Sequence, residues 1–306
     1  MTAIQHGARL EGATPLDHLG VIRASGEDAA KFLHGQLTQD FALLDHGHAR
    51  LCAHLSNKGR MLASFVAFRR GGADVLLVCS RDLLPAALAR LSRFVLRAKV
   101  KLEDASAAFQ LYGLAGSAAA ALLPPQGSAW DKHDAGDASV VQLYPACGQA
   151  RALWLAPAGT PAPAGAALAH GDWLWGEVRS GVATLSVPVV EAFVPQMLNY
   201  ESVGGVNFKK GCYPGQEVVA RSQFRGTLKR RAFIAHASAS VAAGAEVFAA
   251  ADPEQPCGTV AQAAPAPGGG VDAIVSIQLS AAQEPLQAGG AALELLPLPY
   301  ALLEDI

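Results

Sequence analysis

Cys212 lies in the stretch that combines the most chemically active residues of the chain, KKGCYPGQEVVAR at positions 209–221. Pro214 and Gly215 follow it in the order preferred at the two central positions of a type II turn, so the chain is expected to reverse directly after the cysteine. Residues 216–224 contain no proline or glycine and predict a helix. Cys212 is therefore expected close to the N-terminus of a helix.

The charges around Cys212 favour an ionised thiol. Lys209 and Lys210 precede the cysteine, and the positive end of the predicted helix follows it, so both sides stabilise a thiolate. Glu217 and Arg221 stand four positions apart, in the order that favours an ion pair bracing the helix. Cys212 is thus a candidate reactive or ligand-binding thiol; the alternative is a small buried hydrophobic residue beside a turn.

The spacing of the remaining cysteines predicts neither disulfides nor a metal site. They stand far apart, at Cys52, Cys79, Cys147 and Cys257. The chain has no C-x-x-C pair, which zinc sites and iron-sulfur clusters commonly use. A cysteine hydrolase needs a histidine base, and the histidines nearest in sequence are His170 and His236; an approach in space stays open. The residues alone therefore indicate an activated thiol and no more.

Composition limits the class of protein. The chain has 306 residues, of which 51% are hydrophobic and 16% charged, and a formal net charge of -2. A folded globular protein is expected, without the strongly basic balance typical of direct nucleic-acid binding. No apolar run is long enough to span a membrane, and the N-terminal residues do not resemble a signal or transit peptide. We expect a cytoplasmic protein.

Periodicity divides the chain into three parts. Strands and helices alternate in the first part, including a predicted hairpin over 49–69, and a weaker copy of this rhythm follows. The helix predicted over 171–182 carries Trp173, whose simplest interpretation is core packing. Short strands separated by turns follow and predict a small β-barrel or sandwich. The expected fold class is α+β, with lobes at 1–105 and 106–225 and a β-barrel at 226–306.

Residues 195–226 closely resemble the signature of the YgfZ family, folate-binding proteins linked to iron-sulfur proteins. The family core K-G-C-Y-x-G-Q-E-x-x-x-R is matched by Lys210, Gly211, Cys212, Tyr213, Gly215, Gln216, Glu217 and Arg221. Four further stretches look like family segments in the same order: FLHGQLTQD at 32–40, HLSNKGRM at 54–61, RFVLRAKV at 93–100 and LPLPYALLED at 296–305. The resemblance therefore covers nearly the whole chain.

The resemblance implies two related α+β lobes in a ring-like body plus a C-terminal β-barrel. This architecture is shared with the glycine-cleavage T-protein, an aminomethyltransferase that uses tetrahydrofolate. The Asp pair of the T-protein aligns with Ala63 and Ser64, neither of which can act as a carboxylate. The resemblance thus argues against aminomethyl transfer and leaves open whether the chain is an enzyme.

Tetrahydrofolate or a derivative is the cofactor that the resemblance implies. One tryptophan associated with folate in the family aligns with Trp173, and the position of another falls near Leu19. Gln196 and Asn199 precede the cysteine motif and could donate amide hydrogen bonds to folate, or serve the fold.

By resemblance, the chain is expected to assist the assembly or repair of iron-sulfur clusters. Cys212 would be the essential thiol, in transient contact with a cluster and kept ionised by Lys210. The expected partners are folate, iron-sulfur proteins and cluster-assembly factors, and any effect on tRNA modification would be indirect. Two alternatives remain: a tetrahydrofolate-dependent one-carbon transferase, and a thiol-redox enzyme that would bring Cys52, Cys79 or Cys257 close to Cys212.

Overall fold

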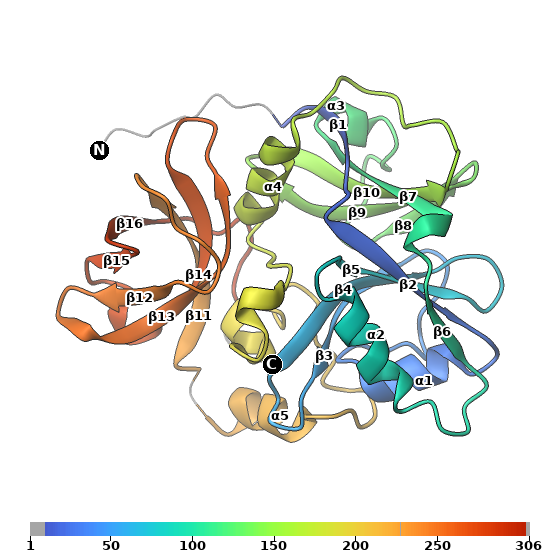
Figure 1. Cartoon of the computed structure of the whole chain (residues 1–306), viewed down its shortest axis with the longest axis horizontal. Coiled ribbons are helices and arrows are strands. Elements are labelled where there is room, and N and C mark those ends of the chain that lie inside the picture. Colours follow the sequence, from blue (N-terminus) through green and yellow to red (C-terminus); the bar gives the residue numbers. More distant parts are fainter. Residues whose placement is uncertain (1–9, 227, 304–306) are drawn as a thin grey trace.

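Two five-stranded antiparallel sheets and a closed six-stranded barrel make up the chain (Figure 1). The computed structural model describes residues 10–226 and 228–303. The family-like segment 296–305 therefore extends beyond the described residues at positions 304 and 305. The predicted α+β class with a C-terminal barrel is confirmed.

Four of the five strands in the first sheet are buried along most of their length, whereas the edge strand Lys101–Asp104 is exposed or half-buried. The order of the sheet is β3 (Ala49–Leu55), β4 (Met61–Arg69), β5 (Val75–Ser80), β2 (Leu19–Ser25) and β6 (Lys101–Asp104). Helix α1 (Ala29–Gln36) connects β2 to β3, and α2 (Leu84–Ser92) connects β5 to β6. The predicted hairpin over 49–69 is present as β3 and β4.

The second sheet includes a strand from the start of the described chain. Its order is β1 (Gly12–Pro15), β7 (Phe109–Ala115), β10 (Gln149–Pro157), β9 (Ala138–Ala146) and β8 (Lys132–Ala135). Helix α3 (Ser117–Ala120) follows β7, and α4 (His170–Arg179) leads away from the sheet. Since β1 pairs with β7 and β2 belongs to the first sheet, the chain crosses between the sheets within residues 16–18.

The barrel closes on itself, so it leaves no strand edge unpaired. Its strands are β11 (Arg230–Ala237), β14 (Val271–Gln278), β13 (Asp252–Pro265), β12 (Glu246–Ala249), β15 (Leu286–Ala288) and β16 (Ala291–Leu296). Trp175 of α4 donates to the Asp272 carboxylate over 2.7 Å, which ties the barrel to the body. Among the described residues, no helix has the length and apolar character to cross a membrane.

The segment between α4 and α5 (Gln216–Phe224) runs along β4. The Met61 N–H donates to the Phe193 carbonyl oxygen over 2.8 Å, and the Glu191 N–H donates back to the Met61 carbonyl oxygen over 2.9 Å. A 3-10 helix, Pro195–Leu198, then packs against α5. The segment that connects α4 to α5 is therefore held against the start of β4 by backbone hydrogen bonds.

Candidate functional site

The turn after Cys212 has the predicted geometry. Gly215 has φ 78° and ψ 0°, the values of the second central residue of a type II turn. The Gln216 N–H donates to the Tyr213 carbonyl oxygen over 3.3 Å, and α5 begins at Gln216. The predicted reversal and helix are confirmed.

Lys210 fixes the loop that carries Cys212 to the end of α1. Its side chain is buried, and its ammonium donates to the carbonyl oxygens of His34 and, over 2.8 Å, of Leu37. The ammonium lies 4.5 Å from the centre of the Tyr213 ring, a cation–π contact. Burial lowers the pKa of Lys210 to about 8. Lys210 thus anchors the loop, in addition to the predicted role of placing positive charge near Cys212.

The turn between β3 and β4 packs directly on the turn after Cys212. A Cβ on Gly215 would lie 2.5 Å from the Ser56 carbonyl oxygen and 2.8 Å from the Gly59 Cα. A Cβ on Gly59 would lie 2.7 Å from Val218 Cβ. The two glycines therefore let two backbones touch. Three of the family-like segments, 32–40, 54–61 and 209–221, meet at this place.

We expect Gly215→Ala to lower the free energy of unfolding by about 2 kcal/mol, because the new Cβ collides with backbone atoms and the positive φ disfavours alanine. Gly148→Ala is the matched control, since Gly148 has φ 72° and open space around its Cα; its cost should stay near 1 kcal/mol. Urea denaturation of the two variants measures the difference. Equal losses would show that the contact with Ser56 contributes nothing.

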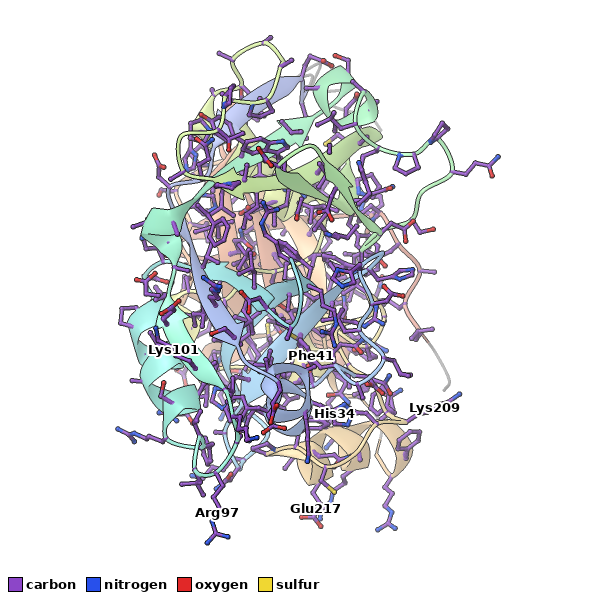
Figure 2. The ribbon with its side chains drawn as sticks, turned by 90° about the vertical axis from the view of Figure 1, so that its right-hand side faces the viewer. His34, Phe41, Arg97, Lys101, Lys209 and Glu217 are labelled. Atoms are coloured by element: carbon purple, nitrogen blue, oxygen red, sulfur yellow. The ribbon has the colours of Figure 1, made fainter. Side chains whose placement is uncertain are left out.

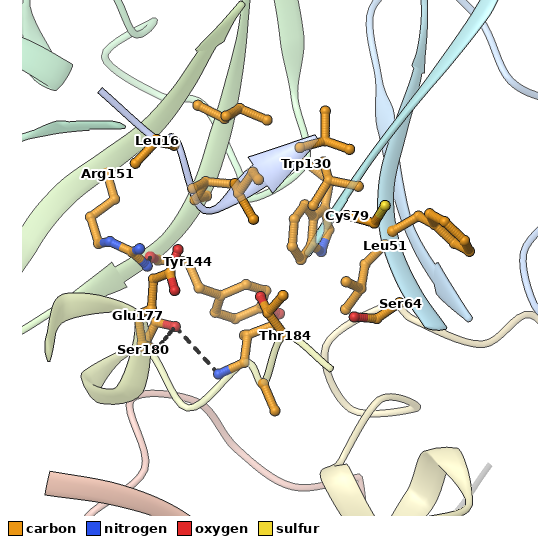
Figure 3. Close-up of a pocket in the computed structure, with 18 of the residues that line it drawn as sticks. Leu16, Leu51, Ser64, Cys79, Trp130, Tyr144, Arg151, Glu177, Ser180 and Thr184 are labelled. Carbon is orange, nitrogen blue, oxygen red and sulfur yellow. Dashed lines mark hydrogen bonds between the residues drawn. The ribbon is translucent and has the colours of Figure 1, made fainter. Parts of the chain in front are cut away.

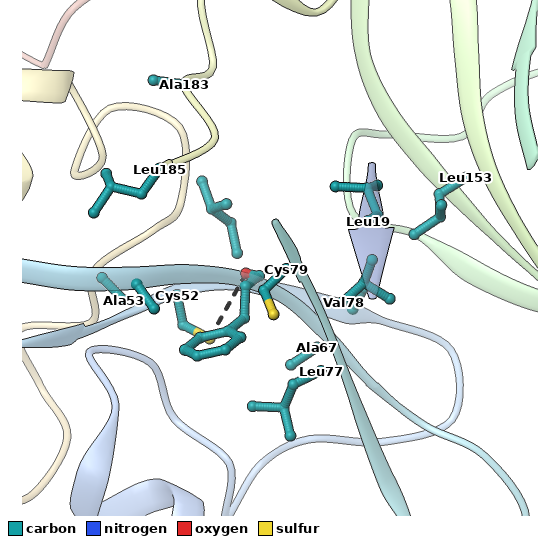
Figure 4. Close-up of a cluster of buried hydrophobic side chains, with 14 of the residues drawn as sticks. Leu19, Cys52, Ala53, Ala67, Leu77, Val78, Cys79, Leu153, Ala183 and Leu185 are labelled. Carbon is teal, nitrogen blue, oxygen red and sulfur yellow. Dashed lines mark hydrogen bonds between the residues drawn. The ribbon is translucent and has the colours of Figure 1, made fainter. Parts of the chain in front are cut away.

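Cys212 is exposed on its loop, as is Cys147, whereas the other cysteines are buried: Cys52, Cys79 and Cys257. Figure 4 shows Cys52 and Cys79 inside an apolar cluster. Burial raises the pKa of the Cys79 thiol to about 12. Within residues 10–226 and 228–303, no group of three or more His, Cys, Asp or Glu could hold a metal ion. The cysteines considered as redox partners of Cys212 are therefore enclosed in protein.

Within the described residues, Glu217 and Arg221 do not form the predicted ion pair. Both side chains are exposed on α5, and neither forms a salt bridge. An exposed pair gains little over hydration of the separate charges, so its absence costs α5 little. The prediction that the pair braces the helix was wrong; the packing of Val219 and its neighbours holds α5.

A cavity lies between the two sheets, and α4 forms one of its walls (Figure 3). Its volume is about 70 Å³. Small-molecule sites commonly measure about 300–1,000 Å³, so the cavity has to widen to take a ligand of that size. The walls are mostly apolar, and the polar side chains among them are Ser64, Tyr144, Arg151, Glu177, Ser180 and Thr184. The chemistry of the lining therefore suits a mainly apolar group with a few polar atoms.

Trp173, Arg151 and Glu177 form one connected group in the cavity wall. The Arg151 guanidinium carbon lies 4.3 Å from the centre of the Trp173 ring, and Trp173 Nε1 donates to Glu177 Oε1 over 2.9 Å. Burial lowers the pKa of Arg151 to about 10, against the opposing charge of Glu177. Arg151 Nε is buried and, among the described residues, has no hydrogen-bond partner. This group offers an aromatic face with both a cation and a carboxylate beside it.

Glu177 is a buried carboxylate held in its ionised form. Burial alone would raise its pKa, but the hydrogen bond and charge of His18 and the charge of Arg151 outweigh burial and hold the pKa below its usual range. Gln262 Nε2 also donates to Glu177 Oε2 over 3.1 Å. The carboxylate is therefore an acceptor whose lone pairs are already largely engaged.

Two of the four predicted folate residues line the cavity, and two do not. Trp173 and Leu19 lie in its wall. Gln196 is fully buried elsewhere and donates to the Val219 carbonyl oxygen of α5 over 2.8 Å. Asn199 is also buried and donates to the Ala232 carbonyl oxygen of β11 over 2.8 Å. Both amides therefore hold α5 and the barrel in place, and the prediction that they contact a ligand in this cavity is corrected.

Ser64, one of the positions aligned with the T-protein Asp pair, lines the cavity. Its Oγ accepts a hydrogen bond from the Leu185 N–H over 2.9 Å, whereas Ala63 is buried outside the cavity lining. The cavity thus has a hydroxyl where the T-protein is expected to have a carboxylate.

Arg151 and Glu177 were not predicted as site residues, although the sequence around each contains a feature that could have pointed to a site. Arg151 is a charge within the apolar strand sequence of β10, and Glu177 stands four positions after Trp173 on the same face of α4. A charge on an otherwise apolar face marks either a salt bridge or a ligand site. The sequence alone could not bring β10 and α4 together.

The cavity and the cysteine loop are separate sites. No residue of 209–221 lines the cavity, and Figure 1 shows α4 and α5 at different levels of the molecule. Strand β4 joins them: Ser64 and Phe65 line the cavity, and the turn that precedes β4 packs on Gly215. Trp173 and Cys212, both predicted as site residues, therefore belong to two separate sites of the same protein.

Comparison with known proteins gives two kinds of relative, although no protein-family model matches the chain. A tRNA-modifying protein YgfZ of Edwardsiella ictaluri is 32% identical over 238 residues, covering 73% of this chain and 70% of that protein. The YgfZ of Yersinia pestis (strain Pestoides F) is 31% identical over 314 residues, covering 95% and 92%. The glycine cleavage system aminomethyltransferase T of Bartonella henselae has the same fold, with a TM-score of 0.67, 16% identity and coverage of 96% and 87%.

Proposed function

The chain belongs to the family of the tRNA-modifying protein YgfZ, and on that basis we propose that it is a folate-binding accessory protein for iron-sulfur cluster assembly or repair. In this role it supports tRNA modification indirectly, through the iron-sulfur enzymes that carry it out. The observation that carries the proposal is the cavity group of Trp173, Arg151 and Glu177, which fits the chemistry of a folate.

The cavity group offers partners for the pterin ring of tetrahydrofolate. The flat pterin requires an aromatic or apolar wall, which Trp173 and Leu19 provide. The pterin edge carries N–H groups, and Glu177 Oε2, which accepts from Gln262, keeps one lone pair for such a donor. The unpartnered Nε of Arg151 is a donor that only a ligand or water could satisfy. When bound, tetrahydrofolate would supply one-carbon or reducing chemistry; the residues named here bind and orient it.

A one-carbon transferase is the less favoured function. Such an enzyme needs a carboxylate free to act on the reacting amine, and Ser64 provides only a hydroxyl that already accepts from Leu185. Glu177 is a carboxylate in the cavity, but Trp173, Gln262 and His18 engage its oxygens. A carboxylate so engaged is a poor base, which supports the accessory role.

Binding of tetrahydrofolate to the purified protein, measured by calorimetry under anaerobic conditions, tests the cavity. We expect one site per chain, and at least roughly tenfold weaker binding in Glu177→Gln, which keeps the shape of the side chain but removes its charge. Glu246→Gln on the exposed edge of the barrel is the matched control and should bind as the wild type does. Wild-type protein that binds no folate, or equal affinity in E177Q, contradicts the assignment.

A further inference from the structure

His34 lies beside the loop that carries Cys212, although the two residues are far apart in sequence. His34 lies in the last turn of α1, and Figure 2 shows it next to the chain that leads into α5. A Cβ on Gly211 would lie 3.4 Å from His34 Nε2. The residue directly before Cys212 thus lies beside the imidazole, and because it has no side chain the space next to Nε2 stays open.

Asp40 orients the imidazole. His34 Nδ1 lies 3.2 Å from Asp40 Oδ1, and the same oxygen accepts the Leu43 N–H over 3.0 Å. Burial alone would raise the pKa of Asp40, but the Leu43 and Ala42 N–H groups and the charge of His34 hold it below its usual range. The Ala42 N–H also approaches Nδ1, over 3.4 Å, but the ionised carboxylate at 3.2 Å is the stronger partner. Asp40 therefore favours a proton on Nδ1, which leaves the lone pair on Nε2. Within the described residues, Nε2 has no hydrogen-bond partner.

The loop cannot drift away from this histidine, because Lys210 binds the same helix end. The Lys210 ammonium donates to the backbone carbonyl oxygen of His34 itself. On the other side, Gly215 packs against Ser56 and Gly59. Cys212 is thus held between two anchored neighbours while its own side chain stays exposed.

We propose that His34, oriented by Asp40, is the base that takes the proton from the Cys212 thiol, an inference that rests on the proposed role of Cys212 as the working thiol. The S–H bond breaks, an N–H bond forms at Nε2, and the Asp40 carboxylate stabilises the resulting imidazolium. The thiolate left behind is suited to a soft ligand or electrophile, such as an iron ion or a sulfur atom on a partner protein.

Other charged groups near the loop do not replace His34 as a base. Those on the elements packed around Cys212 are Lys31, His34, Asp40, Lys58, Lys209, Lys210, Glu217 and Arg221. Lys210 is occupied by two carbonyl oxygens, and the remaining lysines and the arginine are cations that stabilise a thiolate without accepting its proton. Glu217 is exposed on α5. Imidazole is the side-chain type that exchanges a proton near neutral pH, and His34 is the imidazole placed beside this loop.

Alkylation of the whole protein by iodoacetamide tests this arrangement. The thiolate attacks the reagent carbon, a C–S bond forms and iodide leaves, so the rate reports the ionised thiol and needs neither folate nor a cluster. Mass spectrometry of the peptides follows Cys212 and the other exposed cysteine, Cys147, in the same sample. Although Cys147 as a whole is exposed, desolvation of its thiol raises its pKa, which makes it a slow internal reference.

At pH 7 we expect Cys212 in His34→Asn to react roughly tenfold more slowly than in wild type, since asparagine can still donate to Asp40 but lacks Nε2. At about pH 9, above the usual thiol pKa, the rates should converge. Asp40→Asn should give an intermediate loss at pH 7. His48→Asn is the matched control, because His48 Nδ1 lies 2.8 Å from Asp45 in a similar pair outside the α1 end.

Unchanged reactivity of Cys212 in His34→Asn at pH 7 would overturn the proposal. A loss of equal size at pH 7 and at about pH 9 would do the same, because it would mark a structural role for His34. Either result leaves the proposed function intact provided that Cys212 is still needed in cells. If Cys212 reacts as expected but is dispensable in cells, the proposed function fails and the proton transfer stands.

Discussion

Replacing Cys212 by alanine is expected to reduce the support of iron-sulfur enzymes to the level of cells that lack the protein. The side chain is exposed on an anchored loop, and alanine can neither bind iron nor form a bond to sulfur. The change removes one sulfur atom from the surface, so the free energy of unfolding should stay within about 0.5 kcal/mol of wild type. The readout is the amount of sulfur-modified nucleosides in tRNA of a deletion strain that expresses each variant.

Cys147→Ala provides the control for this experiment. Cys147 is the other exposed cysteine, and it lies on the turn between β9 and β10, outside the cysteine loop. This variant should restore tRNA modification fully. Full restoration by Cys212→Ala as well would remove the thiol from the mechanism and leave folate binding as the activity to explain.

The protein should lose about 3 kcal/mol of stability between pH 6.5 and pH 4 through His54 alone. His54 is buried on β3, and burial, with a smaller contribution from the charge of Arg90, lowers its pKa to about 4. The unfolded chain takes up a proton near pH 6.5, but the folded chain resists it until about pH 4. The unfolded state therefore binds more protons in this window, and stability falls as the pH falls.

His54→Leu should remove this contribution, because His54 Nδ1 has no hydrogen-bond partner in the described structure and little is lost with the ring. Urea denaturation of wild type and His54→Leu, each at pH 7 and at pH 4.5, gives the four free energies of unfolding that the comparison needs. Carboxylates with lowered pKa values, such as Asp40 and Asp104, also cost stability in acid, but they do so equally in both proteins. An identical drop in wild type and variant would mean that His54 is protonated in the folded state.

The local geometry of the cysteine loop could be predicted from sequence, because proline, glycine and a breaker-free run act on their immediate neighbours. Gly215 and α5 lie where these rules put them. The short strands separated by turns predicted a barrel or a sandwich, and the resemblance selected the barrel that the structure shows. Trp173 and Leu19, which line the cavity, could be predicted only from the family resemblance, because a family alignment relates residues that are distant in the chain.

Contacts between distant segments could not be predicted. His34 and Gly211 meet only because Lys210 binds the end of α1, and no spacing rule connects the two stretches. Gln196 and Asn199 were misassigned for a related reason: a buried amide that holds a neighbouring strand looks the same in sequence as one that faces a ligand. Which of the two roles an amide has depends on the segments that pack around it, and these are distant in the sequence.

The pairing of β1 with β7 bears on how the protein folds during synthesis. β1 leaves the ribosome first, but its hydrogen-bonding partner is the strand Phe109–Ala115, so its edge stays open while the whole first sheet is made. Contacts of such large sequence separation slow folding, because a long loop must close before they form. A fragment ending at residue 105 would lack that partner strand entirely. We therefore expect the nascent chain to need chaperone protection until β7 has emerged.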